Sequence, residues 1–218
     1  MWTVGQVARR VGRPTRESPG DCRAVIGDIS GCSNAWLQAV RLSHPKVASM
    51  TSSLYITSVP VFKQMLGGLS GILAKADAHA VARKIEPNAL LQARLFPDMF
   101  ALVRQVQVAC DFAKSVSARL GGVEVPSFTD TEQSFADLQA RIVKTLEFID
   151  SLTPQQFEGS DSREIVTQAG TPKEKRFTGQ SYLLNYGLPH FFFHVTTAYG
   201  ILRHNGVEVG KKDYVGTY

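Results

Sequence analysis

The sequence predicts an all-α fold, a four-helix bundle with a small β-hairpin or irregular insertion before the last helix. Apolar residues recur at three- and four-residue spacing in four long stretches after residue 50. Prolines, glycines and capping residues separate these stretches. The connections are short, which predicts that neighbouring helices run antiparallel.

The first stretch starts at Ser52, and a single apolar stripe runs along it. Its members are Phe62, Met65, Leu66, Leu69, Ile72, Leu73, Ala76 and Ala80. Gly67 and Gly71 lie four residues apart, a spacing that either admits a second helix at close range or only loosens the first.

The middle of the chain predicts two further long helices. A short turn at Pro87 precedes a helix from Pro97 to about Leu120, which Gly121-Gly122 ends. Asp130 and Gln133 resemble a capping box that starts the next helix. Thr153-Pro154 predicts one further turn.

The last stretch, Thr178–Asn205, is the most apolar long segment and holds three of the five histidines. Thr178 is its expected N-cap, and Asn205-Gly206 is its expected end. Before it, residues 163–167 alternate in polarity, 169–172 favour a turn, and 175–177 form a short return. This pattern predicts the hairpin.

Charge divides the chain into two parts. Residues 1–49 hold seven Arg and Lys against three Asp and Glu, whereas 50–218 hold seventeen against sixteen. We expect 1–49 to be a disordered or mis-assigned extension and 50–218 to be the bundle domain. The opening WTVGQVARRVGR resembles the first helix of a MerR-type regulator, but a near-neutral body does not favour nucleic acid as a partner.

Other functional classes are disfavoured by what the sequence lacks. No apolar run reaches 18 residues, so no membrane span is expected. The three cysteines form no C-x-x-C pair, which fits a reducing cytoplasm, and Cys110 falls on an apolar helix face. Walker, G-x-G-x-x-G and Ser-His-Asp motifs are absent.

Four segments together resemble one family of bacterial and fungal proteins of unknown function. They are SLYITSVPVF, ARLFPDMFALVRQVQVACDFAK, GGVEVPSF and LPHFFFHVTTAYGILRHNGVEVGKKDY. This family lies in the DinB/YfiT-like superfamily, which is classed with the metalloenzymes. The resemblance implies a four-helix bundle, often dimeric, related to thiol S-transferases and a maleylpyruvate isomerase.

The resemblance also implies a divalent metal, such as Zn, Ni or Fe, held by three histidines. One comes from the second helix and two from an H-x-x-x-H pair on the last, which His190 and His194 match. Residues 88–120 contain no histidine, so Asp98 or Asp111 would supply an oxygen, or His79 a nitrogen. The predicted metal set is therefore His194, His190, His79 and Asp98.

Two functional hypotheses follow. The first is a metal- or histidine-dependent enzyme, similar to a thiol S-transferase, that acts on a small molecule. The second is a non-catalytic, homodimeric bundle that binds a ligand or partner. For His194 the alternatives are a ligand or acid–base role and a buried, neutral, hydrogen-bonded imidazole. His204 lies in the last turn, where a cation favours the helix C-terminus.

Overall fold

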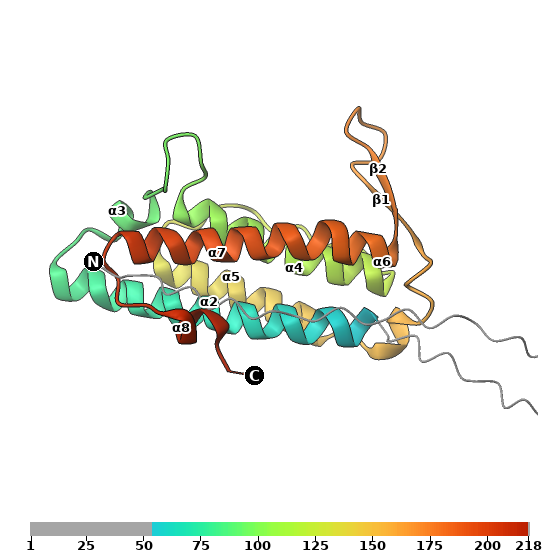
Figure 1. Ribbon diagram of the computed structural model, residues 1–218, viewed down its shortest axis with the longest axis horizontal. Coiled ribbons are helices and arrows are strands. Elements are labelled where there is room, and N and C mark those ends of the chain that lie inside the picture. Colours follow the sequence, from blue (N-terminus) through green and yellow to red (C-terminus); the bar gives the residue numbers. More distant parts are fainter. Residues whose placement is uncertain (1–53, 218) are drawn as a thin grey trace, which may run out of the picture. The chain divides into compact units, whose positions relative to one another are not determined.

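The computed structural model describes residues 54–217, so the predictions made for residues 1–49 lie outside the described part. Four long helices form a bundle with one apolar core between them (Figure 1). The long helices are α2 (Leu54–Arg83), α4 (Leu102–Gly121), α5 (Phe135–Asp150) and the last helix, which consists of α6 (Gly179–Ser181), η2 (Tyr182–Gly187) and α7 (Leu188–His204). The short elements are α3 (Pro87–Leu91), η1 (Pro154–Phe157), β1 (Glu164–Thr167), β2 (Lys175–Thr178) and α8 (Lys211–Val215).

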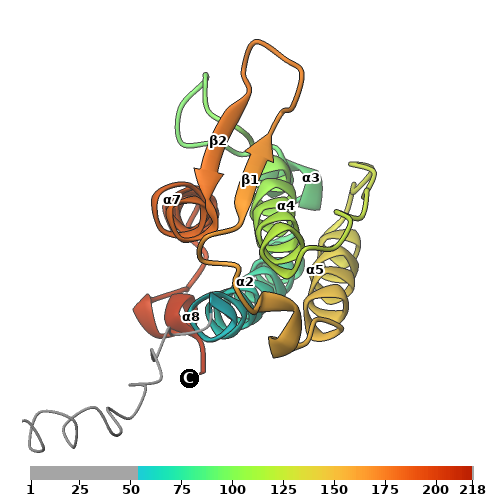
Figure 2. The same cartoon turned by 90° about the vertical axis from the view of Figure 1, so that its right-hand side faces the viewer.

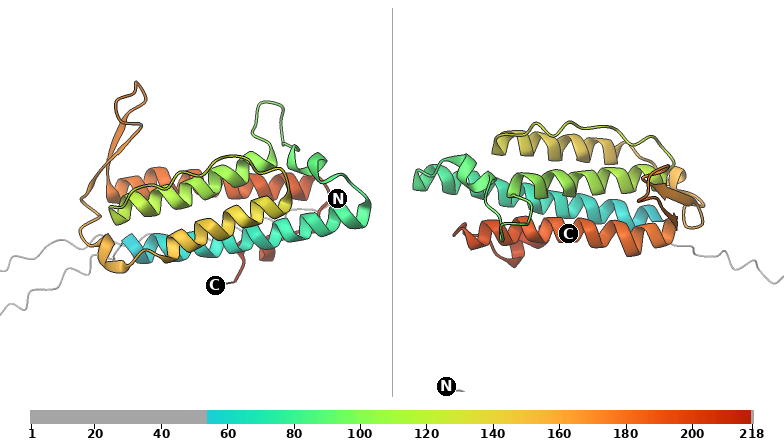
Figure 3. Two further views of the ribbon diagram at one scale, coloured as in Figure 1. Left: turned by 180° about the vertical axis from the view of Figure 1, so that it is seen from behind. Right: turned by 90° about the horizontal axis from the view of Figure 1, so that it is seen from above.

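Seen along its length, the bundle places α7 beside α4, α4 beside α5, and α2 between α5 and α7 (Figure 2). The prediction that all sequence neighbours are antiparallel is wrong for one pair. Residues 122–134 return along the bundle as an extended strap, and α5 then runs parallel to α4 (Figure 3). A strap of this length carries the chain back to the end where α4 began, because an extended residue spans about 3.3 Å and a helical one only about 1.5 Å.

Two helix starts lie later than the sequence predicts. The second long helix begins at Leu102, not Pro97, because the Leu102 amide donates to the Ala93 carbonyl and holds the preceding residues in a loop. The third begins at Phe135, where Ser134 is the N-cap and accepts from the Asp137 amide. Asp130 does not cap it; its carboxylate pairs with arginines instead.

The other boundaries follow the prediction. Gly122 ends α4 in a left-handed conformation (φ 68°), and Thr178 caps the last helix. The hairpin forms, with Ile165 opposite Phe177 in an antiparallel register. After the last helix, the chain forms the short helix α8, which packs on α2. The two helices approach closely at Gly68 of α2, because a Cβ added there would lie 2.8 Å from the Tyr214 carbonyl oxygen of α8.

The hairpin and the loop 92–101 leave the bundle from the same side, one near each end (Figure 1). Between them lie α4 and the last helix, and His194 lies at their shared interface. No helix within residues 54–217 is long and apolar enough to cross a membrane.

Candidate functional site

Four ring side chains follow one another along the last helix at intervals of four residues: Tyr182, Tyr186, His190 and His194. In a regular α-helix each such step turns about 40° further around the axis. The η2 segment is π-helical, and its wider turn works against that drift. Ring centroids of Tyr182 and Tyr186 lie 5.6 Å apart, and those of Tyr186 and His190 lie 4.4 Å apart. The rings of Tyr182, Tyr186 and His190 therefore form a continuous column, and His194 follows one turn further along the helix.

Helix α4 presents three residues to this column. Gln105, Phe112 and Arg119 are spaced by seven, so they share a helix face. The Phe112 ring stacks on His190 (4.9 Å, 22°) and on His194 (5.9 Å, 18°). The Arg119 guanidinium donates to the Tyr182 hydroxyl at 3.0 Å.

One hydrogen bond fixes the tautomer of His194. Its Nδ1 lies 2.7 Å from Gln105 Oε1, while Gln105 Nε2 donates to the Phe100 carbonyl at 3.1 Å. The second contact fixes the amide orientation, so the atom facing His194 is an oxygen, which only accepts. His194 must therefore donate through Nδ1–H, and its Nε2 keeps a free lone pair.

His194 stays neutral at physiological pH. Its side chain is buried, and burial together with nearby His190 and Arg104 lowers the pKa of the imidazole from 6.5 to about 4. Its partner Gln105 is an uncharged amide, so no negative charge opposes these effects. A neutral imidazole with an open Nε2 can accept a hydrogen bond or coordinate a metal.

His190 is the exposed member of the pair. Its Nδ1 contacts the Tyr186 carbonyl at 2.8 Å, and a carbonyl can only accept. Nδ1 is therefore protonated. In both histidines the ring nitrogen that remains for a ligand is Nε2.

The remaining predicted metal ligands do not join this pair. Asp98 is exposed in the loop before α4, and His79 lies near the end of α2 beside Arg83 and Glu208. No three His, Cys, Asp or Glu residues within 54–217 form a group that could hold a metal. The α4 residue that forms a hydrogen bond with His194 is Gln105, whose amide is a poor substitute for a histidine ligand.

Asp111, the alternative oxygen donor, belongs to a different cluster on the other side of α4. This charged cluster consists of Asp111, Lys114, Asp130, Glu132 and Arg141. The Arg141 side chain is 2% exposed and contacts Asp111 and Asp130 at 3.0 Å and Glu132 at 2.8 Å. Lys114 lies 3.0 Å from Asp111. Asp111 is therefore already occupied by two cations.

Cys110 lies next to this charged cluster, within the core. Burial raises the pKa of its thiol to about 12, although a hydrogen bond with Thr145 and the charge of Arg141 act in the opposite direction. The Cys110 side chain is buried, as its place on an apolar helix face predicts, and its thiol stays protonated at physiological pH.

Sequence reasoning missed Gln105, Phe112 and Arg141. Gln105 is a polar residue on the buried face of a helix, 1% exposed, and that pattern was the available signal. The pairing with His194 could not be inferred, because it joins residues 89 positions apart.

The residues described match the family entitled "Domain of unknown function (DUF1993)" over positions 54–215. Among solved structures, the crystal structure of a DinB family member protein from Shewanella denitrificans is 41% identical, with a TM-score of 0.72. The alignment covers 77% of this chain and 94% of that one. No curated protein matches the chain. The chain therefore belongs to the DUF1993 family of domains of unknown function, within the DinB-like superfamily.

Proposed function

We propose that the protein is a histidine-dependent enzyme that acts on a small molecule bound at the interface between α4 and α7. The hydrogen bond between Gln105 and His194 carries the proposal, because it holds a buried, neutral imidazole with Nε2 as its free acceptor. Such a group binds a hydrogen-bond donor, and a hydroxyl or thiol of the substrate is the matching chemistry.

The reaction class that fits best is transfer of a thiol to an electrophilic carbon. The sulfur forms a bond to that carbon, and the leaving group departs with its electron pair. The thiol proton passes to His194 Nε2 and then to water. An imidazole with a pKa of about 4 is a weak base, so it orients the thiol and accepts the proton only as the S–C bond forms and the proton becomes acidic.

A divalent metal is the second candidate, and the outer hydrogen bonds of both histidines favour it. Metal-bound histidines commonly donate their other N–H to a carbonyl or carboxylate, as His190 and His194 do to Tyr186 and Gln105. His190 and His194 would supply two nitrogen ligands, and water or substrate would have to supply the others. When bound, such a metal would lower the pKa of a thiol or water.

The test is a transfer assay with glutathione as the thiol and 1-chloro-2,4-dinitrobenzene as the acceptor, with and without added Zn, Ni or Fe and with a chelator. We expect His194→Gln to reduce the rate by roughly 10²-fold or more. His204→Gln is the matched control, since His204 lies exposed in the last turn of α7. A rate in the native protein equal to the uncatalysed one under every metal condition would exclude this reaction class.

A non-catalytic homodimer is the competing function, and exposed aromatic side chains favour it. Phe96, Phe100 and Phe193 are 63%, 52% and 55% exposed. Analytical sedimentation of the native protein and of Phe193→Ser, together with the transfer assay, distinguishes the homodimer from the enzyme. A dimer that Phe193→Ser dissociates, in a protein without transfer activity, supports the homodimer.

A further inference from the structure

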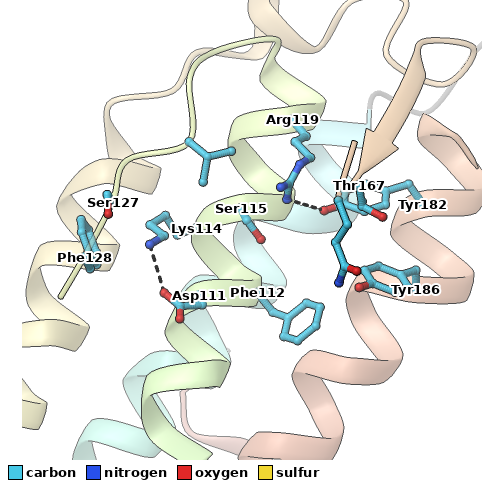
Figure 4. A pocket seen from close by; sticks show the side chains of 12 residues that line it. Asp111, Phe112, Lys114, Ser115, Arg119, Ser127, Phe128, Thr167, Tyr182 and Tyr186 are labelled. Atoms are coloured by element: carbon cyan, nitrogen blue, oxygen red, sulfur yellow. Dashed lines mark hydrogen bonds and ion pairs between the residues drawn. The ribbon is translucent and has the colours of Figure 1, made fainter. Parts of the chain in front are cut away.

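A pocket of about 320 Å³ opens beside the histidines, between α4, η2, the hairpin and the strap. Figure 4 shows Lys114 and Asp111 at one side, Arg119 and Tyr182 meeting at the other, and Ser115 between them. The volume is at the lower end of the range for small-ligand pockets, about 300–1,000 Å³. The pocket therefore suits a compact ligand.

The charges that line this pocket do not balance. Lys114 is offset by Asp111, at 3.0 Å. Arg119 takes part in none of the carboxylate ion pairs within residues 54–217, and its guanidinium contacts the uncharged Tyr182 hydroxyl. Arg119 is half-buried, so water screens its charge only in part. A guanidinium offers paired donors that match a carboxylate.

Aromatic rings form the wall that leads from Arg119 to the histidines. Tyr182 and Tyr186 are stacked, with an angle of 21° between their rings, and the Phe112 ring lies 5.8 Å from that of Tyr186. Their faces and edges favour a flat ring in the ligand. Ser115 and Thr167 line the pocket as well and add hydroxyl groups.

We propose that this pocket binds a small aromatic carboxylate, with the carboxylate on Arg119 and the ring against Tyr186 and Phe112. Arg119 and Phe112 are seven residues apart on α4, about 10 Å along the helix axis. A ligand of that length bound at Arg119 would reach Phe112, whose ring stacks on His190 and His194. This inference rests on the proposed function, because the end of the ligand opposite the carboxylate is the part that would react near the histidines.

The experiment compares three probes by ligand-observed NMR titration: benzoate, the neutral isostere benzamide, and acetate, which has charge but no ring. We expect benzoate to bind most tightly. Arg119→Gln should weaken benzoate binding at least tenfold. Arg119→Lys keeps the positive charge but loses the paired N–H donors of the guanidinium, so it should weaken benzoate binding less. Arg203→Gln, an exposed arginine in the last turn of α7, should leave binding unchanged. Circular dichroism checks that each variant is folded.

Two results would overturn the proposal: equal binding of benzamide and benzoate, or undiminished benzoate binding by folded Arg119→Gln. If Arg119→Gln does not fold, unchanged affinity in Arg119→Lys overturns it in the same way. The same measurements distinguish failure of the pocket proposal from failure of the proposed enzyme activity. Benzoate binding that depends on Arg119 in a protein without transfer activity supports the pocket alone, and transfer activity that depends on His194 without benzoate binding supports the enzyme alone.

Discussion

The two sides of α4 hold polar groups in opposite ways. Toward α5 and the strap, the buried cation Arg141 meets three carboxylates at 2.8–3.0 Å. Toward α7, a neutral imidazole and an amide are joined by a hydrogen bond, and Arg119 donates to the uncharged Tyr182 hydroxyl. On the first side, Arg141 Nε has no hydrogen-bond partner among residues 54–217. On the second side, His194 uses Nδ1 for its hydrogen bond to Gln105, which leaves Nε2 as the acceptor nitrogen.

This difference separates structural from functional polarity. Charges that are paired with one another fix how α4, α5 and the strap dock, and they offer little to a ligand. Neutral groups with a fixed tautomer and an open acceptor cost less to bury and remain available for binding. We therefore expect the charged cluster to stabilise the fold, whereas the proposed function uses the interface with α7.

The largest expected effect tests the charged cluster. Arg141→Met should destabilise the fold by about 3–5 kcal/mol, because it leaves Asp111, Asp130 and Glu132 without their shared cation. Urea denaturation measures this loss. The matched control is Arg176→Met, whose ion pairs lie on the exposed hairpin and which should leave the midpoint unchanged. Equal midpoints for Arg141→Met and the native protein would mean that the cluster does not stabilise the fold.

The second effect concerns pH and His194. The folded pKa lies near 4 and the unfolded value near 6.5, so protonation favours the unfolded chain. Stability is therefore complete above pH 6.5 and falls as the pH drops toward 4, by up to about 3 kcal/mol. His194→Gln should flatten this part of the curve of unfolding free energy against pH. An unchanged slope in the variant would assign the pH dependence to other groups.

A third prediction alters the partner of His194. Gln105→Glu would place a carboxylate against Nδ1 and raise the histidine pKa by roughly 1–3 units, making the buried group cationic at a higher pH. Gln105→Leu would leave Nδ1–H unpaired and cost roughly 1–3 kcal/mol. NMR titration of the His194 ring follows the first change, and denaturation follows the second. A pKa still near 4 in Gln105→Glu would contradict the assigned hydrogen bond.

The smallest effect concerns the strap. The Phe128 ring lies 4.1 Å from Lys114 Nζ and 4.3 Å from Lys144 Nζ, with the Arg141 guanidinium at 5.8 Å. Phe128→Leu keeps most of the apolar volume and should cost about 0.5–1 kcal/mol through the lost cation–π contacts. Phe96→Leu, at an exposed position, serves as the control. If both substitutions have the same effect on the unfolding free energy, the cations contribute nothing through the ring.

The sequence predicted local features well because each depends on neighbouring residues. Gly122 ends α4 and Thr178 caps the last helix, and both signals are read within one turn of the chain. The starts of α4 and α5 were misplaced because distant groups compete with the local cap. Asp130 has the side chain of an N-cap, but Arg104 and Arg141 bind it instead.

By itself, then, the sequence determined the all-α class, the hairpin and a last helix with two histidines four residues apart, since periodicity and capping are local properties. Only the tertiary structure decided what those histidines face. The packing of α4 against α7 and the π-helical turn at Tyr182–Gly187 bring Gln105 and Phe112 to the histidines and Arg119 to Tyr182. These contacts join residues more than sixty positions apart, and no local pattern encodes them.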